Sequence, residues 1–396
     1  MKKVGIITFC NCVNYGAELQ AFALQKELNL LGADAEVIHI EKEKWAMQGS
    51  YWTILTAIKK RIQMFGFWGG TLKTIGLIKD KLAVRKAAKL NRDKQALKAE
   101  VFDSFFNNYI RHSARYYTLD ELREGKLDIA YDVIVAGSDQ IWNYMQTHYL
   151  DVFFLEFAKR LNTKKVSYAA SFSVDSIPAA LHAKYRHLIE NINAISVREL
   201  SGQKLVSQIS DRKAELVLDP TFLFTSKEWV EMVANPDYMK DDKRYVVIYT
   251  LSGSKYIYSL AKKIGKELGA EVLNIKSGYV RIKGDEGITH LYDVGPREFI
   301  SIFCHAVYVI TDSFHGTAFS INFNVPFTTL LNPVSNLNSR VLSILELTNT
   351  MDRLIYDIGD NREPDRLDMD YTPINKIIND WRDKSLCFIN REIIKV

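Results

Sequence analysis

The stretch AVYVITDSFHGTAFSINF, residues 306–323, decides the fold of this 396-residue chain. It begins with an apolar, β-branched run at 307–310, which predicts a buried parallel strand. The N-cap residues 311–313 follow, and then the apolar spacing becomes typical of a helix. A strand that passes directly into a capped helix predicts an α/β sheet. The turn between them lies at the carboxyl edge of the sheet, where open α/β sheets bind ligands.

His315 is the imidazole in the first turn of this predicted helix, close to Ser313, Gly316 and Thr317. The unpaired N–H groups at a helix start favour an anion, and a glycine lets a ligand approach the backbone. We therefore predict an anion-binding site here. A hydrogen-bonded capping histidine is the alternative that the position alone leaves open. The helix N-terminus also predicts a lowered pKa for His315, which a bound phosphate would raise again.

The composition is that of a soluble globular protein, with 47% hydrophobic and 25% charged residues. The length suffices for two domains with separate cores. The four cysteines contain no C-x-x-C pair, which indicates a reduced, cytosolic setting. Cys10 and Cys12 form a C-x-C without the nearby histidine or further cysteine of a zinc site. We expect MKKVGIITF to be a first strand rather than a signal peptide, and no apolar run is long enough to span a membrane.

The N-terminal segment predicts a βαβ unit, with strands at 4–9 and 35–40 and a helix at 17–31 that ends at Gly32. The loop before this helix carries small and polar groups, which suit a phosphate or a sugar hydroxyl. These residues are Asn14, Tyr15 and Gly16. A plain strand-to-helix turn is the alternative.

Polar side chains follow another predicted strand at 132–136. Asp139 and Gln140 offer a carboxylate and an amide, and Trp142 offers an aromatic face. This mixture is typical of sugar binding, because hydroxyl groups need donors and acceptors while the C–H face of a sugar ring packs on an aromatic. Asp139 could instead be a helix N-cap only.

Arg198 directly follows a predicted strand at 195–197, and a further strand is predicted at 165–170. An arginine at the carboxyl end of a strand suits a bidentate contact with a carboxylate or a phosphate. A salt bridge to Glu199 or to a neighbouring acid is the alternative.

Residues 45–110 have helical propensity and a strong positive charge. Between residues 51 and 98 there are 12 Lys or Arg and two Asp, a surplus of ten, against a net charge of +5 for the chain. The exposed-looking aromatics Trp52, Phe67 and Trp68 accompany this charge. The segment is either a solvated helical insertion or a contact with an anionic membrane surface. No nucleic-acid-binding motif accompanies it.

The dipeptide Asp219-Pro220 marks a break, after which strand and helix patterns alternate again. These later elements are predicted at 245–250, 256–268, 271–275 and 326–331. Residues 373–396 predict one long C-terminal helix. The fold class is therefore α/β, with two Rossmann-like parallel-sheet domains at 1–215 and 216–372. We expect these domains to face a cleft and the C-terminal helix to pack back across them.

The segment TDSFHGTAFS resembles the signature of the polysaccharide pyruvyl transferase family, and five further segments resemble the family in the expected order. They are FCNCVNYGAELQAFALQKEL, VIVAGSDQIWN, KKVSYAASF, ISVREL and LVLDPTFL. The resemblance implies a GT-B-like fold and transfer of the pyruvyl group of phosphoenolpyruvate to two hydroxyls of one sugar. This reaction forms a ketal and releases orthophosphate, with no metal and no redox cofactor. The resemblance also implies an acceptor carried on a lipid diphosphate at the inner membrane face, for a bacterial capsule or exopolysaccharide.

With this resemblance, we expect His315 to act as a general acid or phosphate contact and Asp139 as a second catalytic group. The predicted donor-binding residues are Arg198, Ser313, His315, Gly316 and Thr317. The predicted acceptor-binding residues are Asn14, Tyr15, Gly16, Asp139, Gln140 and Trp142. Better-known members carry an arginine two residues before the histidine, where this chain has Ser313. Another cation would have to replace it, and the candidates are Lys276, Arg281 and Arg297.

Two other function classes stay open. A glycosyltransferase on a GT-B scaffold would use a nucleotide-sugar donor and release a nucleoside diphosphate. A non-catalytic sugar- or lipid-binding protein would release neither this product nor orthophosphate. We expect a cytoplasmic protein, peripheral at the inner membrane face, with no nucleic-acid partner.

Overall fold

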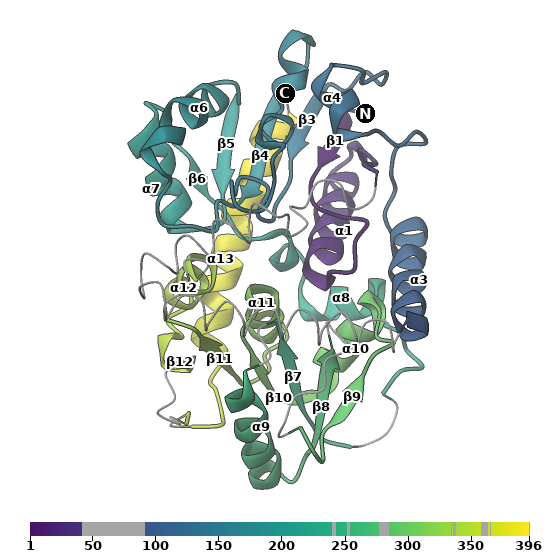
Figure 1. Cartoon of the computed structure of the whole chain (residues 1–396), viewed down its shortest axis with the longest axis vertical. Helices are drawn as coiled ribbons and strands as arrows, with labels where there is room; N and C mark the ends of the chain where they lie inside the picture. Colours follow the sequence, from purple (N-terminus) through teal and green to yellow (C-terminus); the bar gives the residue numbers. More distant parts are fainter. Residues whose placement is uncertain are drawn as a thin grey trace, which may run out of the picture.

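The computed structural model describes residues 1–41, 92–239, 243–251, 254–276, 285–333, 335, 338–357, 363–364 and 366–395. These residues form two six-stranded sheets, one in each half of the chain (Figure 1). All strand pairs in both sheets are parallel. The predicted α/β class with two parallel sheets is thus confirmed, and buried apolar runs such as VIVA in β3 explain it.

The N-terminal sheet has the strand order β2-β1-β3-β4-β5-β6. Its strands are β1 (Lys3–Ile7), β2 (Asp34–Val37), β3 (Val133–Ala136), β4 (Lys164–Ala170), β5 (Ala194–Val197) and β6 (Glu215–Leu216). The helices of this half are α1 (Tyr15–Leu30), α3 (Arg92–Tyr109), α4 (Leu119–Arg123), α5 (Leu150–Phe153), α6 (Ala179–Glu190) and α7 (Leu200–Ile209). The predicted βαβ unit is confirmed, but β2 ends earlier than expected. The chain beyond it forms isolated bridges with the segment after α3, from Val37 to His112 and from Ile40 to Tyr117.

The C-terminal sheet has the strand order β12-β11-β10-β7-β8-β9. Its strands are β7 (Tyr245–Thr250), β8 (Glu271–Lys276), β9 (Thr289–Leu291), β10 (Ala306–Thr311), β11 (Phe327–Leu331) and β12 (Leu354–Tyr356). The helices of this half are α8 (Ser226–Met232), α9 (Lys255–Leu268), α10 (Pro296–His305), α11 (Phe314–Asn322) and α12 (Ser339–Leu347). The stretch that decides the fold is therefore β10 followed directly by α11, as predicted.

Each sheet has one point where the strand order reverses. In the N-terminal sheet this point lies between β1 and β3, and in the C-terminal sheet it lies between β7 and β10. In open α/β sheets such a switch point leaves a crevice at the carboxyl ends of the two strands, because the following helices leave on opposite faces. The topology thus marks, on each sheet, the position where open α/β sheets bind their ligands.

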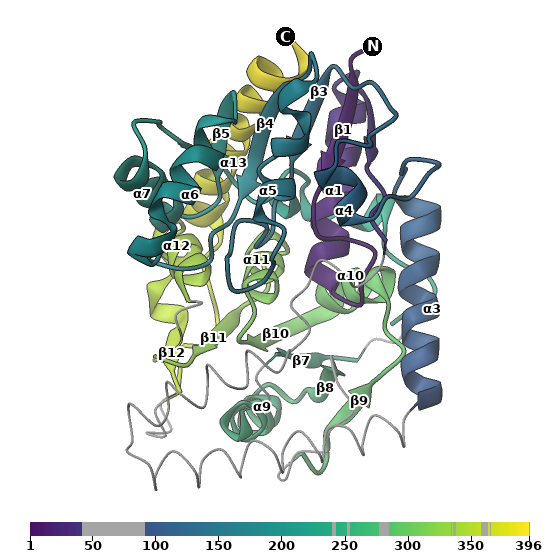
Figure 2. The same ribbon diagram turned by 45° about the horizontal axis from the view of Figure 1, so that its top comes forward.

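Helix α13 (Thr372–Ile389) returns from the C-terminal half to the N-terminal sheet and continues into a π-helical turn (Asn390–Ile394). Figures 1 and 2 show it running alongside both halves, so that the two ends of the chain lie at the same end of the molecule. The N–H of Leu218 donates to Ser385 Oγ at 2.9 Å. Lys164 of β4 forms an ion pair with Glu392 at 2.7 Å. The C-terminal helix therefore ties the last segment of the chain to the N-terminal sheet.

Most of the predicted basic insertion lies outside the described residues, including Trp52, Phe67 and Trp68. Its described end is α3, which packs Phe102, Phe105 and Phe106 into the main core. Lys98 is also buried there, with Nζ 5.0 Å from the ring centroid of Tyr15. This end of the segment is thus a packed helix. No helix among the described residues has both the length and the apolar character that a bilayer span requires.

Candidate active site

A cavity of about 550 Å³ lies between the carboxyl edges of the two sheets. The N-terminal sheet contributes the loops after β1 and β3, and the C-terminal sheet contributes the loops after β7, β10, β11 and β12. Its polar lining includes Asn14, Asp139, Gln140, Asp312, Ser313, His315, Asn332, Arg340 and Asp357. The cavity therefore joins the switch points of both sheets, and it contains the histidine that the sequence predicts.

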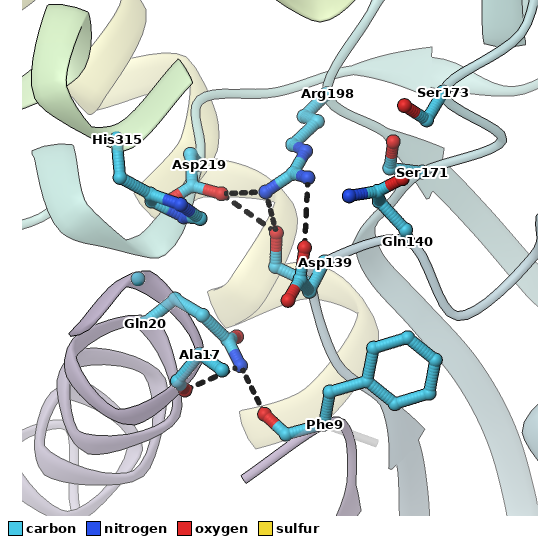
Figure 3. Close-up of polar contacts among 12 residues, drawn as sticks. Phe9, Ala17, Gln20, Asp139, Gln140, Ser171, Ser173, Arg198, Asp219 and His315 are labelled. Atoms are coloured by element: carbon cyan, nitrogen blue, oxygen red, sulfur yellow. Dashed lines mark hydrogen bonds and ion pairs between the residues drawn. The ribbon is translucent and has the colours of Figure 1, made fainter. Parts of the chain in front are cut away.

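His315 lies in the first turn of α11, which packs all nine of its residues into the protein. Its Nε2 is buried, has no hydrogen-bond partner among the described residues and lies 4.0 Å from Asp219 Oδ1 (Figure 3). Burial lowers the pKa of His315 to about 4, and Asp219 only partly offsets this effect. The sequence predicted the direction of this shift from the helix N-terminus, but burial is its main cause. The free protein thus holds a neutral imidazole beside a carboxylate at neutral pH.

Arg198 follows β5 and is fully buried behind the cavity. Its Nη1 donates to Asp219 Oδ2 at 2.6 Å and its Nη2 donates to Asp139 Oδ1 at 3.2 Å (Figure 3). Burial alone would raise the pKa of Asp219, but Arg198 and then His315 lower it to about 2. The guanidinium thus donates to two acids of the protein and lies within ion-pair distance of a third, Glu199, which is the alternative that the sequence left open beside a donor contact.

Glu199 follows Arg198 directly and pairs with it at a longer distance than the other two acids. Its Oε1 accepts from Ser171 Oγ at 3.0 Å and from the N–H groups of Phe172 at 2.7 Å and Ser173 at 3.0 Å. Its Oε2 lies 3.9 Å from Arg198 Nε. Glu199 therefore fixes the loop after β4, and this loop supports Asp139, whose carbonyl accepts from Ser171 N–H at 3.0 Å.

Helix α1 of the N-terminal half covers His315 from the opposite side. A Cβ atom at Gly16 would lie 1.9 Å from His315 Nδ1. The Asn14 side chain caps α1 by accepting from the N–H groups of Gly16 at 3.0 Å and Ala17 at 3.3 Å. Gln20 holds the same turn, since its Nε2 donates to the carbonyls of Phe9 and Ala17 (Figure 3). The predicted loop therefore provides a wall for the imidazole, and Asn14 lines the cavity as well.

Two aromatics that the sequence predicts as acceptor contacts lie in the core. Trp142 has no exposed surface, stacks on Phe154 at 4.2 Å and donates from Nε1 to Phe153 O at 3.1 Å. Tyr15 stacks on Phe299 at 4.7 Å and donates to Val294 O at 2.8 Å. Their faces pack against other aromatics, so this arrangement offers neither of them to a sugar.

The residues around His315 have different surroundings. Ser313 lines the cavity, and its N–H donates to Thr311 Oγ1 at 3.0 Å. Gly316 is needed for close packing on β10, because a Cβ there would lie 2.2 Å from Thr311 Oγ1. Thr317 Oγ1 is buried and within hydrogen-bond distance of Ser313 O and Thr329 Oγ1. Of these residues, Ser313 and His315 line the cavity. Gly316 was expected to let a ligand approach the backbone, but its α-carbon packs closely on β10 instead.

Two site residues were not predicted as such. Asp219 was interpreted only as a break before the second domain, although it is buried between Arg198 and His315. Arg340, the second residue of α12, lines the cavity and has its guanidinium carbon 5.7 Å from the ring centroid of Phe314. No motif in the sequence indicates it, and no helix was predicted after the strand at 326–331.

The cations that the sequence offered as replacements lie elsewhere or outside the described part. Arg297 donates from Nε to Val233 O at 3.1 Å and from Nη2 to Ala234 O at 3.3 Å, and it does not line the cavity. The side chain of Lys276 and the whole of Arg281 lie outside the described residues.

Several solved structures share this fold at low sequence identity. The UDP-GlcNAc 2-epimerase from Methanocaldococcus jannaschii has a TM-score of 0.51 and 12% identity, over 96% of this chain and 92% of that chain. The complex of S. aureus MnaA with UDP has a TM-score of 0.51 and 10% identity, over 99% of this chain and 91% of that chain. The UDP-GlcNAc 2-epimerase from Neisseria meningitidis bound to UDP-GlcNAc has a TM-score of 0.50 and 10% identity, over 98% and 100%. The predicted GT-B-like arrangement is confirmed, and identities this low concern the fold alone.

At the level of sequence, no curated protein matches the chain significantly. The model of one family, described as polysaccharide pyruvyl transferase, matches residues 14–333. This match runs from the cap of α1 to the loop after β11 and includes every predicted site residue. Since it covers most of the chain together with the histidine and the carboxylates around it, the protein belongs to the polysaccharide pyruvyl transferase family of enzymes.

Proposed function

We propose that this enzyme transfers the pyruvyl group of phosphoenolpyruvate to two hydroxyls of one sugar in a surface polysaccharide and releases orthophosphate. The observation that carries the proposal is the position of His315. This buried, neutral imidazole lies 4.0 Å from a carboxylate, in the wall of a cavity at the switch points of both sheets. Membership of the family supports pyruvyl as the transferred group, and the enol phosphate is a donor that carries this group in activated form.

The first step is protonation of the methylene carbon of the donor. Protonated His315 gives its proton to this carbon, the double bond supplies the electron pair, and the neighbouring carbon becomes an oxocarbenium-like centre. A sugar hydroxyl then forms a bond to this centre and loses its proton to a general base. We assign this base to Asp139, whose carboxylate lines the cavity.

The second step closes the ketal. The bond from the central carbon to the phosphate oxygen breaks, the second hydroxyl of the sugar attacks, and its proton leaves with the phosphate. The products are a pyruvate ketal and hydrogen phosphate. Of the two hydroxyl protons, one therefore ends on the new methyl group, by way of Asp139 and His315, and the other on the phosphate.

Asp219 acts through His315, because its carboxylate favours the protonated form of the imidazole. The imidazole must carry a proton to act as an acid, but burial disfavours its charged form in the free protein. The phosphate of a bound donor carries about −1.5 to −2 charges, and Asp219 lies beside Nε2. Donor binding would thus raise the pKa of His315 and couple proton uptake to occupation of the site.

The acceptor would enter from the N-terminal side of the cavity. Asn14 and Gln140 line it there with amide groups. We propose a sugar carried on a lipid diphosphate as the acceptor. The surplus of ten positive charges between residues 51 and 98 supports a weak, salt-sensitive contact with an anionic membrane.

The test is incubation of the purified protein with phosphoenolpyruvate and lipid-linked sugars extracted from cells, followed by mass spectrometry and a phosphate assay. The expected product is the sugar plus one C₃H₂O₂ unit, with an equal amount of orthophosphate. Release of a nucleoside diphosphate from a nucleotide sugar would show a glycosyltransferase instead. No release with any acceptor would favour a non-catalytic binding protein.

A further inference from the structure

We infer that Arg340 is the anion anchor of this cavity and binds the carboxylate or the phosphate of the donor. The inference rests on the proposed function, since it names the group that holds the substrate of the same site. Arg340 lines the cavity, its Nε is buried without a hydrogen-bond partner, and across the described residues the side chain makes no hydrogen bond or ion pair.

The other charges of the cavity already have partners. The carboxylate of Asp139 accepts from Arg198 at 3.2 Å. The carboxylate of Asp312 accepts from Thr250 Oγ1 and from the N–H of Leu251, both at 2.7 Å. The carboxylate of Asp357 accepts from Ser254 Oγ. Each acid that lines the cavity is thus held by a protein group other than Arg340, whose charge remains available to a ligand.

A guanidinium without a counter-ion is costly away from water. Burial lowers the pKa of Arg340 to about 10, and the charge of Arg198 adds to this effect, while Asp139, Glu199 and Asp219 offset it only in part. A carboxylate or phosphate in the cavity would restore the missing interaction through charge-assisted hydrogen bonds, which the planar fork of arginine forms in pairs. The unpaired state in the free protein is therefore what an anion site requires.

Helix N-termini reinforce the charge at the same place. Helices α11 and α12 begin at the cavity, at Phe314 and Ser339, and each has nine residues. Their cap residues, Ser313 and Asn338, both line the cavity, and neither side chain accepts a capping hydrogen bond from its helix. The first N–H groups of two helices are thus left without a side-chain cap beside Arg340, and such groups favour an anion.

The anchor also connects to the acid. The charge of Arg340 is one of the influences that lower the pKa of His315. An anion bound to Arg340 would offset this repulsion and favour protonation of the imidazole. Arg340 would therefore hold the donor and, through the donor's charge, prepare His315 for proton transfer.

The test measures ligand binding rather than turnover alone. The melting temperature of the wild-type protein should rise with phosphoenolpyruvate, and isothermal titration gives the affinity. In Arg340→Gln the affinity should fall about 10- to 100-fold, as expected for loss of hydrogen bonds to a charged group. Arg340→Lys should recover part of it. The control Lys266→Gln, at an exposed cation of α9, should leave the affinity unchanged.

Two smaller probes identify the anion. If pyruvate protects the wild type against melting and loses this effect in Arg340→Gln, Arg340 binds the carboxylate. If orthophosphate behaves in this way, Arg340 binds the phosphate. Unchanged affinity for all three ligands in Arg340→Gln would overturn the inference.

The stability of the free variant gives an independent check. Because Arg340 is unpaired, Arg340→Gln should melt no lower than the wild type in the absence of ligand. A large loss of stability in both Arg340→Gln and Arg340→Lys would indicate a structural role and contradict the inference.

If Arg340-dependent binding is present but no sugar gains a pyruvyl group, the proposed function fails while the anion site stands. If transfer proceeds with unchanged donor affinity in Arg340→Gln, the anion site fails while the proposed function stands.

Discussion

The imidazole of His315 packs directly against the α-carbon of Gly16, so that a Cβ at Gly16 would lie 1.9 Å from Nδ1. The two residues belong to helices of different halves of the chain, α11 and α1. The contact shows that the N-terminal half sets the position of a side chain carried by the C-terminal half. A catalytic role for His315 would therefore depend on how the two halves meet.

Gly16→Ala should displace the imidazole of His315, because an overlap of this size forces either the ring or α1 to move. We expect turnover to fall about 100-fold, as misplacement of a catalytic group by about 1 Å can cause, with a smaller effect on melting temperature. The control is Gly202→Ala on α7, where the nearest atom, of Phe172, would lie 3.2 Å from the added Cβ. Equal turnover in Gly16→Ala and the wild type would show that the position of His315 is not critical.

His315→Gln should lower turnover by at least about 100-fold, the usual effect of removing a general acid. The protein should stay folded, since glutamine is polar and of similar length. The measurement is orthophosphate release per active protein, with His148→Gln at an exposed histidine as the control. Near-normal turnover in His315→Gln would leave the histidine as a packing residue only.

The low pKa of His315 also predicts how stability depends on pH. The unfolded chain takes up a proton near the ordinary value of 6.5, whereas the folded chain does so only near 4. Between these values the unfolded state binds more protons, so the free energy of unfolding should fall as the pH is lowered from about 6.5 to 4. The full contribution is about 3 kcal/mol, at 1.36 kcal/mol per pKa unit.

Denaturant titrations of the wild type and His315→Gln across this range isolate the effect, because Asp219, the acid whose pKa His315 also lowers, titrates below it. The difference between their free energies of unfolding should change with pH and level off below pH 4. Saturating orthophosphate should reduce the change in the wild type, since an anion raises the pKa of His315. A difference that stays constant with pH would contradict the buried, neutral state.

The sequence predicted the fold from apolar runs and helix caps, and these features act locally. Strand β10, the start of α11 and the βαβ unit at the N-terminus follow from them directly. The site was predicted only where a strand passes into a loop or a capped helix, as at Asp139 and His315. Arg340 was not predicted because no helix was predicted after the strand at 326–331, although α12 begins there. Trp142 was predicted as a ligand contact because its pattern resembles sugar sites, but burial against Phe154 decides its position.

Arg198→Lys separates a positioning role from a direct donor contact. The guanidinium donates to both Asp219 and Asp139, and lysine keeps the charge but loses the fork that reaches both. Loss of one hydrogen bond to a charged group costs about 1.5 to 3 kcal/mol. We therefore expect a lower melting temperature and lower turnover, with little change in the KM for phosphoenolpyruvate. A raised KM with an unchanged melting temperature would instead place the guanidinium on the donor. The control is Arg212→Lys, whose guanidinium donates to Asn193 O on the protein surface and has no part in the cavity.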